Sequence, residues 1–163
     1  MIERTLVLLK PDAVQRCVIG ELITRFEKTG LKIVGIKMQY VSEDQARKHY
    51  DEDLEKRRGK YVRDSNIRFI TSSPLISICL EGIHAVEIVR KLIGSTEPKS
   101  ALPGTIRGDY AHMSYLHADK VKKAIPNLIH ASDSAESAKK EIKLWFTEKE
   151  LHSYETVHDL HIL

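Results

Sequence analysis

Cysteine and aromatic residues are both scarce in this 163-residue sequence. The two cysteines, Cys17 and Cys79, are far apart and match no metal-binding or redox spacing, so we expect two reduced thiols. Aromatic residues make up 6% of the chain. A sheet that binds RNA carries aromatic and basic side chains on a central strand, and the apolar runs 5–9 and 75–80 contain neither. This scarcity disfavours a nucleic-acid-binding module, and no specific nucleic-acid partner is expected.

Long hydrophobic runs are missing as well, and so are repeats, low-complexity segments and linkers. No apolar run approaches the roughly 20 residues that a membrane-spanning helix needs. The N-terminal sequence MIERTLVLLKPDAV lacks the basic, apolar and small-residue regions of a signal peptide. We therefore expect a cytoplasmic protein without a membrane partner. The length fits one domain over residues 1–163.

Positive charge is in slight excess. The chain has 26 lysines and arginines against 23 aspartates and glutamates, which gives a net charge of +3. Such a balance helps to attract phosphate-bearing ligands. It is too small to indicate nucleic-acid binding on its own.

Hydrophobic periodicity and helix-start signals predict the secondary structure. Apolar runs predict strands over Thr5–Leu9, Leu31–Val41, Ile67–Thr71 and Leu75–Leu80. Helices are predicted over Gly20–Lys28, from the capping box at Ser42 and Gln45 through Tyr50, over Ala85–Ile93, and from the box at Asp133 and Glu136 to about Phe146. This order predicts an α+β fold, a ferredoxin-like α/β sandwich with a four-stranded antiparallel sheet covered by helices. The stretches 51–66 and 109–126 are predicted to be surface excursions.

His130 and Glu141 are candidate partners. On a helical projection Glu141 lies about 60° from Ala138, at the edge of the apolar face, at roughly 100° per residue. A partly buried carboxylate needs a partner, and His130 lies just before this helix. An imidazole that donates from one nitrogen keeps the other free as a nucleophile. Taken alone, such a pair is more often a purely structural His–Glu contact.

Lys10 and Arg107 are candidate phosphate ligands. Lys10 ends an apolar run, where it places a positive charge at the end of a strand. Arg107 lies between Gly104 and Gly108, which allow a tight turn and a close approach of a ligand. Its planar guanidinium suits phosphate oxygens. Considered alone, each residue is better explained by an ordinary role, a solvent-exposed lysine at a strand end and an arginine in a surface turn. No histidine set has metal-ligand spacing, so no direct protein metal site is expected.

Three segments together resemble nucleoside diphosphate kinases. They are TLVLLKPDAVQR, PGTIRGD and IHASDSAESA, and the resemblance extends in order over nearly the whole chain. It implies transfer of a γ-phosphoryl group from a nucleoside triphosphate to a nucleoside diphosphate by a ping-pong mechanism. The intermediate would be a phosphohistidine at Nδ1 of His130, with Mg²⁺ as the cofactor, held mainly by the nucleotide phosphates.

The resemblance also assigns roles to individual residues. Glu141 matches the carboxylate that holds the other ring nitrogen of His130, and Ser132 matches a hydroxyl near it. Lys10 matches a catalytic cation. The residues that match contacts to phosphates and ribose are Lys10, Tyr50, Arg90, Thr96, Arg107 and Asn127. The family forms oligomers, and from the C-terminal extension we expect a homohexamer, with a tetramer or a dimer as alternatives.

Two segments depart from the family pattern. The usual PFF segment, whose phenylalanine stacks on the base, is replaced by RRGKYVRDSN, so Tyr61 or Val62 is expected to take its place and Asn66 to contact the base. The stretch 109–127 is longer than usual, and we hypothesise that it alters nucleotide preference or assembly. A catalytically weak family member with a scaffolding role is the alternative that these departures leave open.

Overall fold

The computed structural model describes residues 2–162. Its centre is a four-stranded sheet in the order β2-β3-β1-β4, formed by β2 (Lys32–Gln39), β3 (Leu75–Ile83), β1 (Ile2–Leu9) and β4 (Ile129–Ala131). All three neighbouring pairs are antiparallel. The α+β fold with a four-stranded antiparallel sheet is therefore confirmed.

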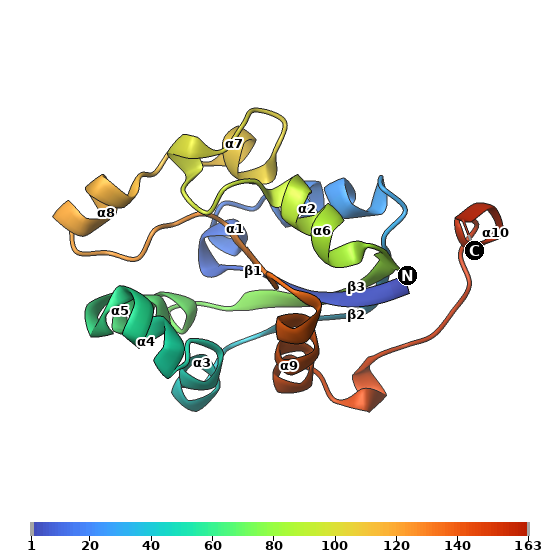
Figure 1. Cartoon of the computed structure of the whole chain (residues 1–163), viewed down its shortest axis with the longest axis horizontal. Coiled ribbons are helices and arrows are strands. Elements are labelled where there is room, and N and C mark those ends of the chain that lie inside the picture. Colours follow the sequence, from blue (N-terminus) through green and yellow to red (C-terminus); the bar gives the residue numbers. More distant parts are fainter. Residues whose placement is uncertain (1, 163) are drawn as a thin grey trace.

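Helices cover both faces of the sheet (Figure 1). The layer drawn above the sheet contains α1 (Pro11–Gln15), α2 (Ile19–Glu27), α6 (Ala85–Ile93), α7 (Ile106–Tyr110) and α8 (Tyr115–Lys120). The layer below contains α3 (Glu43–His49), α4 (Glu52–Arg58), α5 (Lys60–Ile70) and α9 (Ala135–Trp145). The remaining elements are η1 (Pro98–Ser100), η2 (Glu148–Glu150) and α10 (Asp159–Ile162).

Strand β1 divides the hydrophobic core into two clusters. Because side chains alternate along a strand, Leu6 and Leu8 face one layer while Val7 and Leu9 face the other. All four side chains are fully buried. This central strand ends at Lys10, so the side chain after the last core residue lies where the two layers separate.

The predicted strand Ile67–Thr71 is wrong. These residues belong to the last turn and the C-cap of α5, in which Ile67 and Ile70 are buried. The spacing of three residues puts both on one helical face, whereas a short apolar run satisfies either period. The surface stretch 51–66 is largely helical, and no residue of α4 is buried.

Serine side chains cap two helices of the lower layer. The Ser42 side chain accepts from the backbone N–H of Gln45, as the capping box predicted. The start predicted for α9 is one residue early, because Ser134 rather than Asp133 is the N-cap and accepts from the N–H of Ser137. The buried face of α9 is as predicted and includes Trp145, whose truncation to alanine would cost about 3–5 kcal/mol.

Strand β2 forms one edge of the sheet and bears exposed apolar side chains. The predicted strand Leu31–Val41 is shortened to Lys32–Gln39, and its register shifts between Ile33 and Gly35. The shift places Ile36 and Met38 on the surface, with 49% and 58% of their area exposed.

None of the helices in the described part of the chain has the length and apolar character of a membrane-spanning segment.

Candidate functional site

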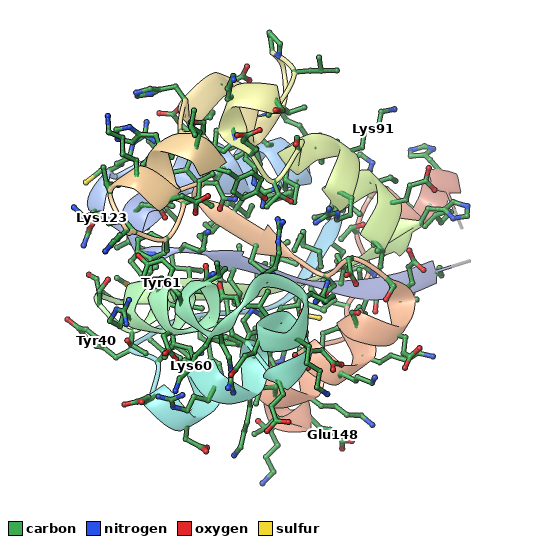
Figure 2. All side chains as sticks on the ribbon, turned by 60° about the vertical axis from the view of Figure 1, so that its left-hand side comes forward. Tyr40, Lys60, Tyr61, Lys91, Lys123 and Glu148 are labelled. Atoms are coloured by element: carbon green, nitrogen blue, oxygen red, sulfur yellow. The ribbon has the colours of Figure 1, made fainter. Side chains whose placement is uncertain are left out.

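A cleft of about 740 Å³ opens between the two helical layers. Its lower wall comes from α4 and α5 and its upper wall from the segment around α8. Figure 2 shows Tyr61 of the lower layer and Lys123 of the upper layer on the same side of the molecule. Nine of the ten predicted site residues line the cleft, namely Lys10, Tyr50, Tyr61, Arg90, Thr96, Arg107, Asn127, His130 and Glu141. The tenth, Ser132, is buried and contacts Glu141.

His130 and Glu141 form the central contact of the cleft. His130 lies on β4, opposite Leu8 of β1, and its Nε2 is 3.1 Å from both carboxylate oxygens of Glu141. The hydroxyl of Ser132 donates to one of these oxygens at 2.5 Å. Since an ionised carboxylate only accepts, the neutral ring of His130 carries its proton on Nε2. The other ring nitrogen, Nδ1, is therefore the one with a free lone pair.

Glu141 is held in its ionised form. Burial alone would raise its pKa, but the attraction of His130 and the hydrogen bonds from His130 and Ser132 outweigh burial and lower the pKa to about 2. The carboxylate therefore stays charged throughout the neutral pH range. It can stabilise positive charge that develops on the imidazole ring.

Two buried cations, Lys10 and Arg107, line the cleft. Lys10 is 4% exposed, and burial lowers the pKa of its ammonium group to about 8. Its Nζ lies 5.4 Å from the centre of the Phe69 ring. Burial also lowers the pKa of Arg107, to about 10, which leaves the guanidinium charged at neutral pH. Desolvated cations of this kind are suited to a polyanionic ligand that replaces their lost hydration.

Backbone carbonyls fix the direction of Arg107. Its Nη1 donates to the carbonyl of Gly94 at 2.9 Å, and its Nη2 donates to that of Ile129 at 2.6 Å. Nε is buried and has no partner among the described residues. The guanidinium group of Arg107 thus connects the loop after α6 to β4, the strand that bears His130.

A strained turn precedes His130. Leu128 has a φ of 69°, and the N–H of Ile129 donates to the carbonyl of Asn127 at 2.8 Å, which is a γ-turn of the rare positive-φ kind. Asp12 of α1 accepts from the N–H of Leu128 at 2.9 Å. The Asn127 side chain donates to the carbonyl of Thr96 at 2.7 Å. These contacts place Asn127 and His130 on the cleft and bury Leu128 in the core.

The sequence reasoning missed His49. This last residue of α3 lies against His130, with the ring centres 4.5 Å apart and the planes at 84°. The Nε1 of Trp145 donates to its Nδ1 at 3.3 Å. A histidine directly before the matched Tyr50 was the available signal, but helical periodicity gives no reason to single it out.

Residues 3–151 match the family model described as nucleoside diphosphate kinase. The chain belongs to this family. The nucleoside diphosphate kinase of Pyrococcus furiosus is 50% identical over 153 residues, which are 94% of this chain and 88% of that relative. The Borreliella burgdorferi enzyme of the same name is 43% identical over 155 residues, or 94% of this chain and 93% of that relative. The resemblance seen in the sequence is thereby confirmed.

Solved structures of family members have the same fold. A Borrelia burgdorferi nucleoside diphosphate kinase, a transition-state mimic with bound vanadate and ADP, superimposes with a TM-score of 0.96 at 41% identity, covering 99% of this chain and 96% of that one. The Halobacterium salinarum enzyme in complex with CDP gives a TM-score of 0.85 at 38% identity, covering 100% and 99%.

Part of the rim of the cleft comes from residues 57–66, the segment RRGKYVRDSN. Tyr61, Val62 and Asn66 of α5 all line the cleft, as expected, and the Tyr61 ring is 43% exposed. The amide of Asn66 donates to the carbonyl of Val62 in its own helix. On the other wall Tyr115 of α8 also lines the cleft, within the segment 109–127. The sequence analysis identified that segment but none of its individual residues.

Arg58 connects the two walls of the rim. Its guanidinium carbon lies 5.2 Å from the centre of the Tyr115 ring, so a cation–π contact joins α4 to α8. The rim also bears Arg57 and Lys123. Positive charge therefore extends from the buried cations to the entrance.

The protein offers no metal cage of its own within residues 2–162. The one group of three metal-ligand side chains is His49, His130 and Glu141, with ligand atoms within 4.8 Å of one another. Two imidazoles do not match the all-oxygen octahedral coordination that Mg²⁺ prefers. Glu141 already accepts hydrogen bonds from His130 and Ser132. These three side chains alone are therefore poorly suited to hold Mg²⁺.

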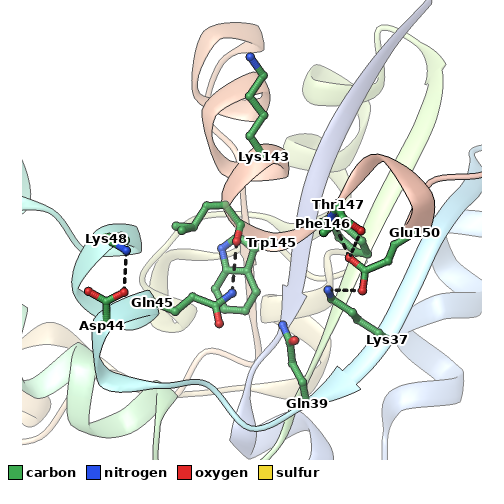
Figure 3. A pocket seen from close by; sticks show the side chains of 11 residues that line it. Lys37, Gln39, Asp44, Gln45, Lys48, Lys143, Trp145, Phe146, Thr147 and Glu150 are labelled. Atoms are coloured by element: carbon green, nitrogen blue, oxygen red, sulfur yellow. Dashed lines mark hydrogen bonds and ion pairs between the residues drawn. The ribbon is translucent and has the colours of Figure 1, made fainter.

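A second, smaller pocket of about 350 Å³ lies between β2 and the ends of α3 and α9 (Figure 3). Its charged side chains are engaged with each other, since Lys37 binds Glu150 at 2.7 Å and Lys48 binds Asp44 at 2.6 Å. Lys143 extends away from it. The larger cleft, with its imidazole and two buried cations, is the candidate active site.

Proposed function

We propose that this chain transfers the γ-phosphoryl group of a nucleoside triphosphate to a nucleoside diphosphate through a phosphohistidine at His130. One observation carries the proposal: Nε2 of His130 faces Glu141, so Nδ1 is the free nucleophilic nitrogen in a cleft lined by buried cations. Family membership supports the same reaction.

The first half-reaction forms a P–N bond and breaks a P–O bond. Nδ1 of His130 attacks the γ-phosphorus, and the electron pair of the broken bond leaves on the β-phosphate oxygen of the nucleoside diphosphate. The ring becomes positively charged as the bond forms, and Glu141 stabilises this charge through the Nε2 proton. The second half-reaction is the reverse, with another nucleoside diphosphate as the acceptor.

The cations hold and neutralise the phosphates. Phosphoryl transfer depends mainly on positioning and on stabilisation of charge. We assign this role to Lys10, Arg90 and Arg107, and we assign contacts with the phosphates and ribose to Tyr50, Thr96 and Asn127. When bound to the phosphates, Mg²⁺ supplies further charge neutralisation and orients them.

The bound ligands of the relatives support this assignment. The Borrelia burgdorferi structure contains ADP and vanadate and is a transition-state mimic. The Halobacterium salinarum structure contains CDP. A purine and a pyrimidine nucleotide in two structures of this fold favour loose recognition of the base. We propose that Tyr61 supplies the stacking surface here, since its ring lines the cleft and is partly exposed.

We also propose that the chain acts as one domain and assembles into a homohexamer, with a tetramer or a dimer as alternatives. The exposed apolar side chains of Ile36, Met38 and Tyr40, on or directly after the edge strand β2, support self-association. The free thiols of Cys17 and Cys79 support a cytoplasmic location.

The decisive experiment is phosphorylation with γ-labelled ATP and Mg²⁺, followed by a chase with GDP. We expect acid-labile, alkali-stable label on the wild type, none on His130→Ala, and discharge of the label as GTP. Circular dichroism checks that the variant is folded. Absence of label on the folded wild type would contradict the proposal and favour the scaffolding alternative.

A further inference from the structure

His49 is a half-buried imidazole for which the proposed reaction has no use. Three rings surround it, those of Tyr50 at 4.8 Å, His130 at 4.5 Å and Trp145 at 5.4 Å between centroids. It belongs to α3, whereas His130 belongs to β4, so the contact joins a helix to the edge strand of the sheet.

The tautomer of His49 follows from Trp145. An indole Nε1 can only donate, so Nδ1 of His49 must accept its hydrogen bond at 3.3 Å. The proton of the neutral ring is therefore on Nε2, which is buried without a partner among residues 2–162. Burial, together with repulsion from His130, lowers the pKa of His49 to about 3, so the ring is neutral at neutral pH.

Glu141 alone does not fix the ring of His130. Its two oxygens lie at equal distances, 3.1 Å, from Nε2 and hold that corner of the ring. Rotation of the imidazole about its Cβ–Cγ bond changes the direction of Nδ1. The ring of His49 stands at 84° to that of His130 at van der Waals range, so such a rotation would drive one ring into the other.

We propose that His49 is a positioning residue that holds the plane of the His130 ring, so that Nδ1 points along the line of attack. The inference rests on the proposed phosphotransfer and adds a residue to it. Trp145 in turn fixes the His49 ring, and Trp145 is itself fixed, because its side chain is 1% exposed in the lower core cluster. The packed core thereby restrains the His130 ring through the rings of Trp145 and His49.

Two substitutions distinguish the effect of the His49 ring from the effect of its hydrogen bond with Trp145. His49→Phe keeps a flat ring against His130 but removes the acceptor for Trp145. His49→Asn keeps an acceptor near the Nδ1 position but removes the ring. His84→Asn is the matched control, since His84 is exposed at the N-cap of α6 and has a φ of 51°, which asparagine tolerates.

The measurement is the single-turnover rate of His130 phosphorylation by Mg²⁺–ATP over a range of ATP concentrations. For His49→Asn we expect a maximal rate about tenfold or more below that of the wild type with an unchanged half-saturating ATP concentration, since small misorientation of a reacting atom is costly. His49→Phe should stay within about threefold, and His84→Asn should match the wild type. The ¹⁵N shifts of His130 should change in His49→Asn only, because the plane of the His130 ring, and with it the geometry of its hydrogen bond to Glu141, is no longer held.

Three outcomes would overturn the inference. They are a wild-type rate in His49→Asn, a loss in His49→Phe that exceeds the loss in His49→Asn, which would assign the effect to the hydrogen bond with Trp145, and a change in the half-saturating ATP concentration alone. A wild-type protein that takes up no label would instead contradict the proposed function. The two failures are therefore distinguishable.

Discussion

The hydroxyl of Ser132 and the imidazole of His130 donate to the same carboxylate, that of Glu141, at 2.5 Å and 3.1 Å. His130 on β4 and Ser132, two residues further along the chain, therefore share one acceptor on α9. The distance from His130 to both oxygens makes the carboxylate, not a single atom, the partner of the ring.

Removal of the Glu141 charge should slow phosphorylation of His130 more than it weakens nucleotide binding. Glu141→Gln keeps the shape but supplies no negative charge to the imidazolium, and a charge-assisted hydrogen bond is worth about 1.5–3 kcal/mol. We expect the rate of His130 phosphorylation to fall about 10- to 100-fold with little change in nucleotide affinity. Ser132→Ala is the milder comparison and should cost less than Glu141→Gln. Equal phosphorylation rates in wild type and Glu141→Gln would show that the charge is not used.

Nucleotide binding should weaken above pH 8 because of Lys10. The pKa of this buried lysine is lowered to about 8, so its positive charge is present below that pH and is lost as the pH rises through it. The KM for the nucleoside triphosphate should therefore rise between about pH 8 and pH 9.5. In Lys10→Arg, whose guanidinium stays charged, the KM should be flat over this range. A rise of the same size in both proteins would assign the effect to another group.

The same lysine contributes to the stability of the fold with a defined sign. Its folded-state pKa is below the unfolded value, so between about pH 8 and pH 10.5 the unfolded chain binds more protons than the native one. The contribution of Lys10 to the free energy of unfolding therefore rises with pH in this window. Denaturant unfolding of the wild type and Lys10→Met over pH 7–10 measures it as the difference between the two slopes.

Asp12 should be needed for the turn before His130. Its carboxylate accepts from the buried N–H of Leu128, and Asp12→Ala leaves that donor unpaired at a cost of about 1–3 kcal/mol of unfolding free energy. Phosphorylation of His130 should fall as well, because the turn sets the position of β4. Asp12→Asn retains an acceptor and should lose less on both counts. If denaturant titration finds no difference between the alanine and asparagine variants, the hydrogen bond has no role.

Tyr61 should contribute to nucleotide affinity through its ring. Stacking of a base on an aromatic side chain is worth about 1–3 kcal/mol, so Tyr61→Ala should raise nucleotide KM about 5- to 150-fold while the maximal rate changes little. Tyr61→Phe keeps the ring and should behave as the wild type. An unchanged KM in Tyr61→Ala would transfer the stacking role to Tyr115, the aromatic residue of the opposite wall.

A charge on the exposed edge strand should disrupt assembly. Met38 of β2 is 58% exposed on an edge strand, and Met38→Glu places a carboxylate where apolar contact between copies is proposed. Sedimentation velocity should show a smaller particle than the wild type. Lys91→Glu on α6 is the control, since Lys91 is exposed on a helix that packs mainly on β1 and β4, not on β2 (Figure 2). A wild-type sedimentation coefficient in Met38→Glu would exclude this edge from the interface.

The sequence predicted well the parts of the fold that depend on local signals. The Ser42 cap and the buried face of α9 are examples, since both are set within one or two helical turns. The segment Ile67–Thr71 failed because its short apolar run fits either a strand or the end of a helix, and only packing against the lower layer decides.

Only the site residues that lie within sequence motifs could be predicted from the sequence. His130 and Glu141 lie eleven residues apart in the sequence, so a helical projection could bring them together. The contacts of His49 and Asp12 cross 81 and 116 residues to reach β4 and the turn before it, and the half-buried rim residue Tyr115 lies in a segment without a motif. Such contacts depend on how α1, α3 and α8 pack around the strand, which no local pattern specifies.

At position 128 the backbone conformation and the packing of the core favour different amino acids. Glycine would relax the left-handed backbone but would leave a hole where Leu128, 1% exposed, now packs, and loss of a buried leucine costs about 2–5 kcal/mol. A β-branched residue would fill part of the space and strain the backbone further. Leucine is thus a compromise between conformational ease and a full core. Consensus or cavity-filling design aimed at a more heat-resistant form of this protein has little to gain at this position and should begin elsewhere in the chain.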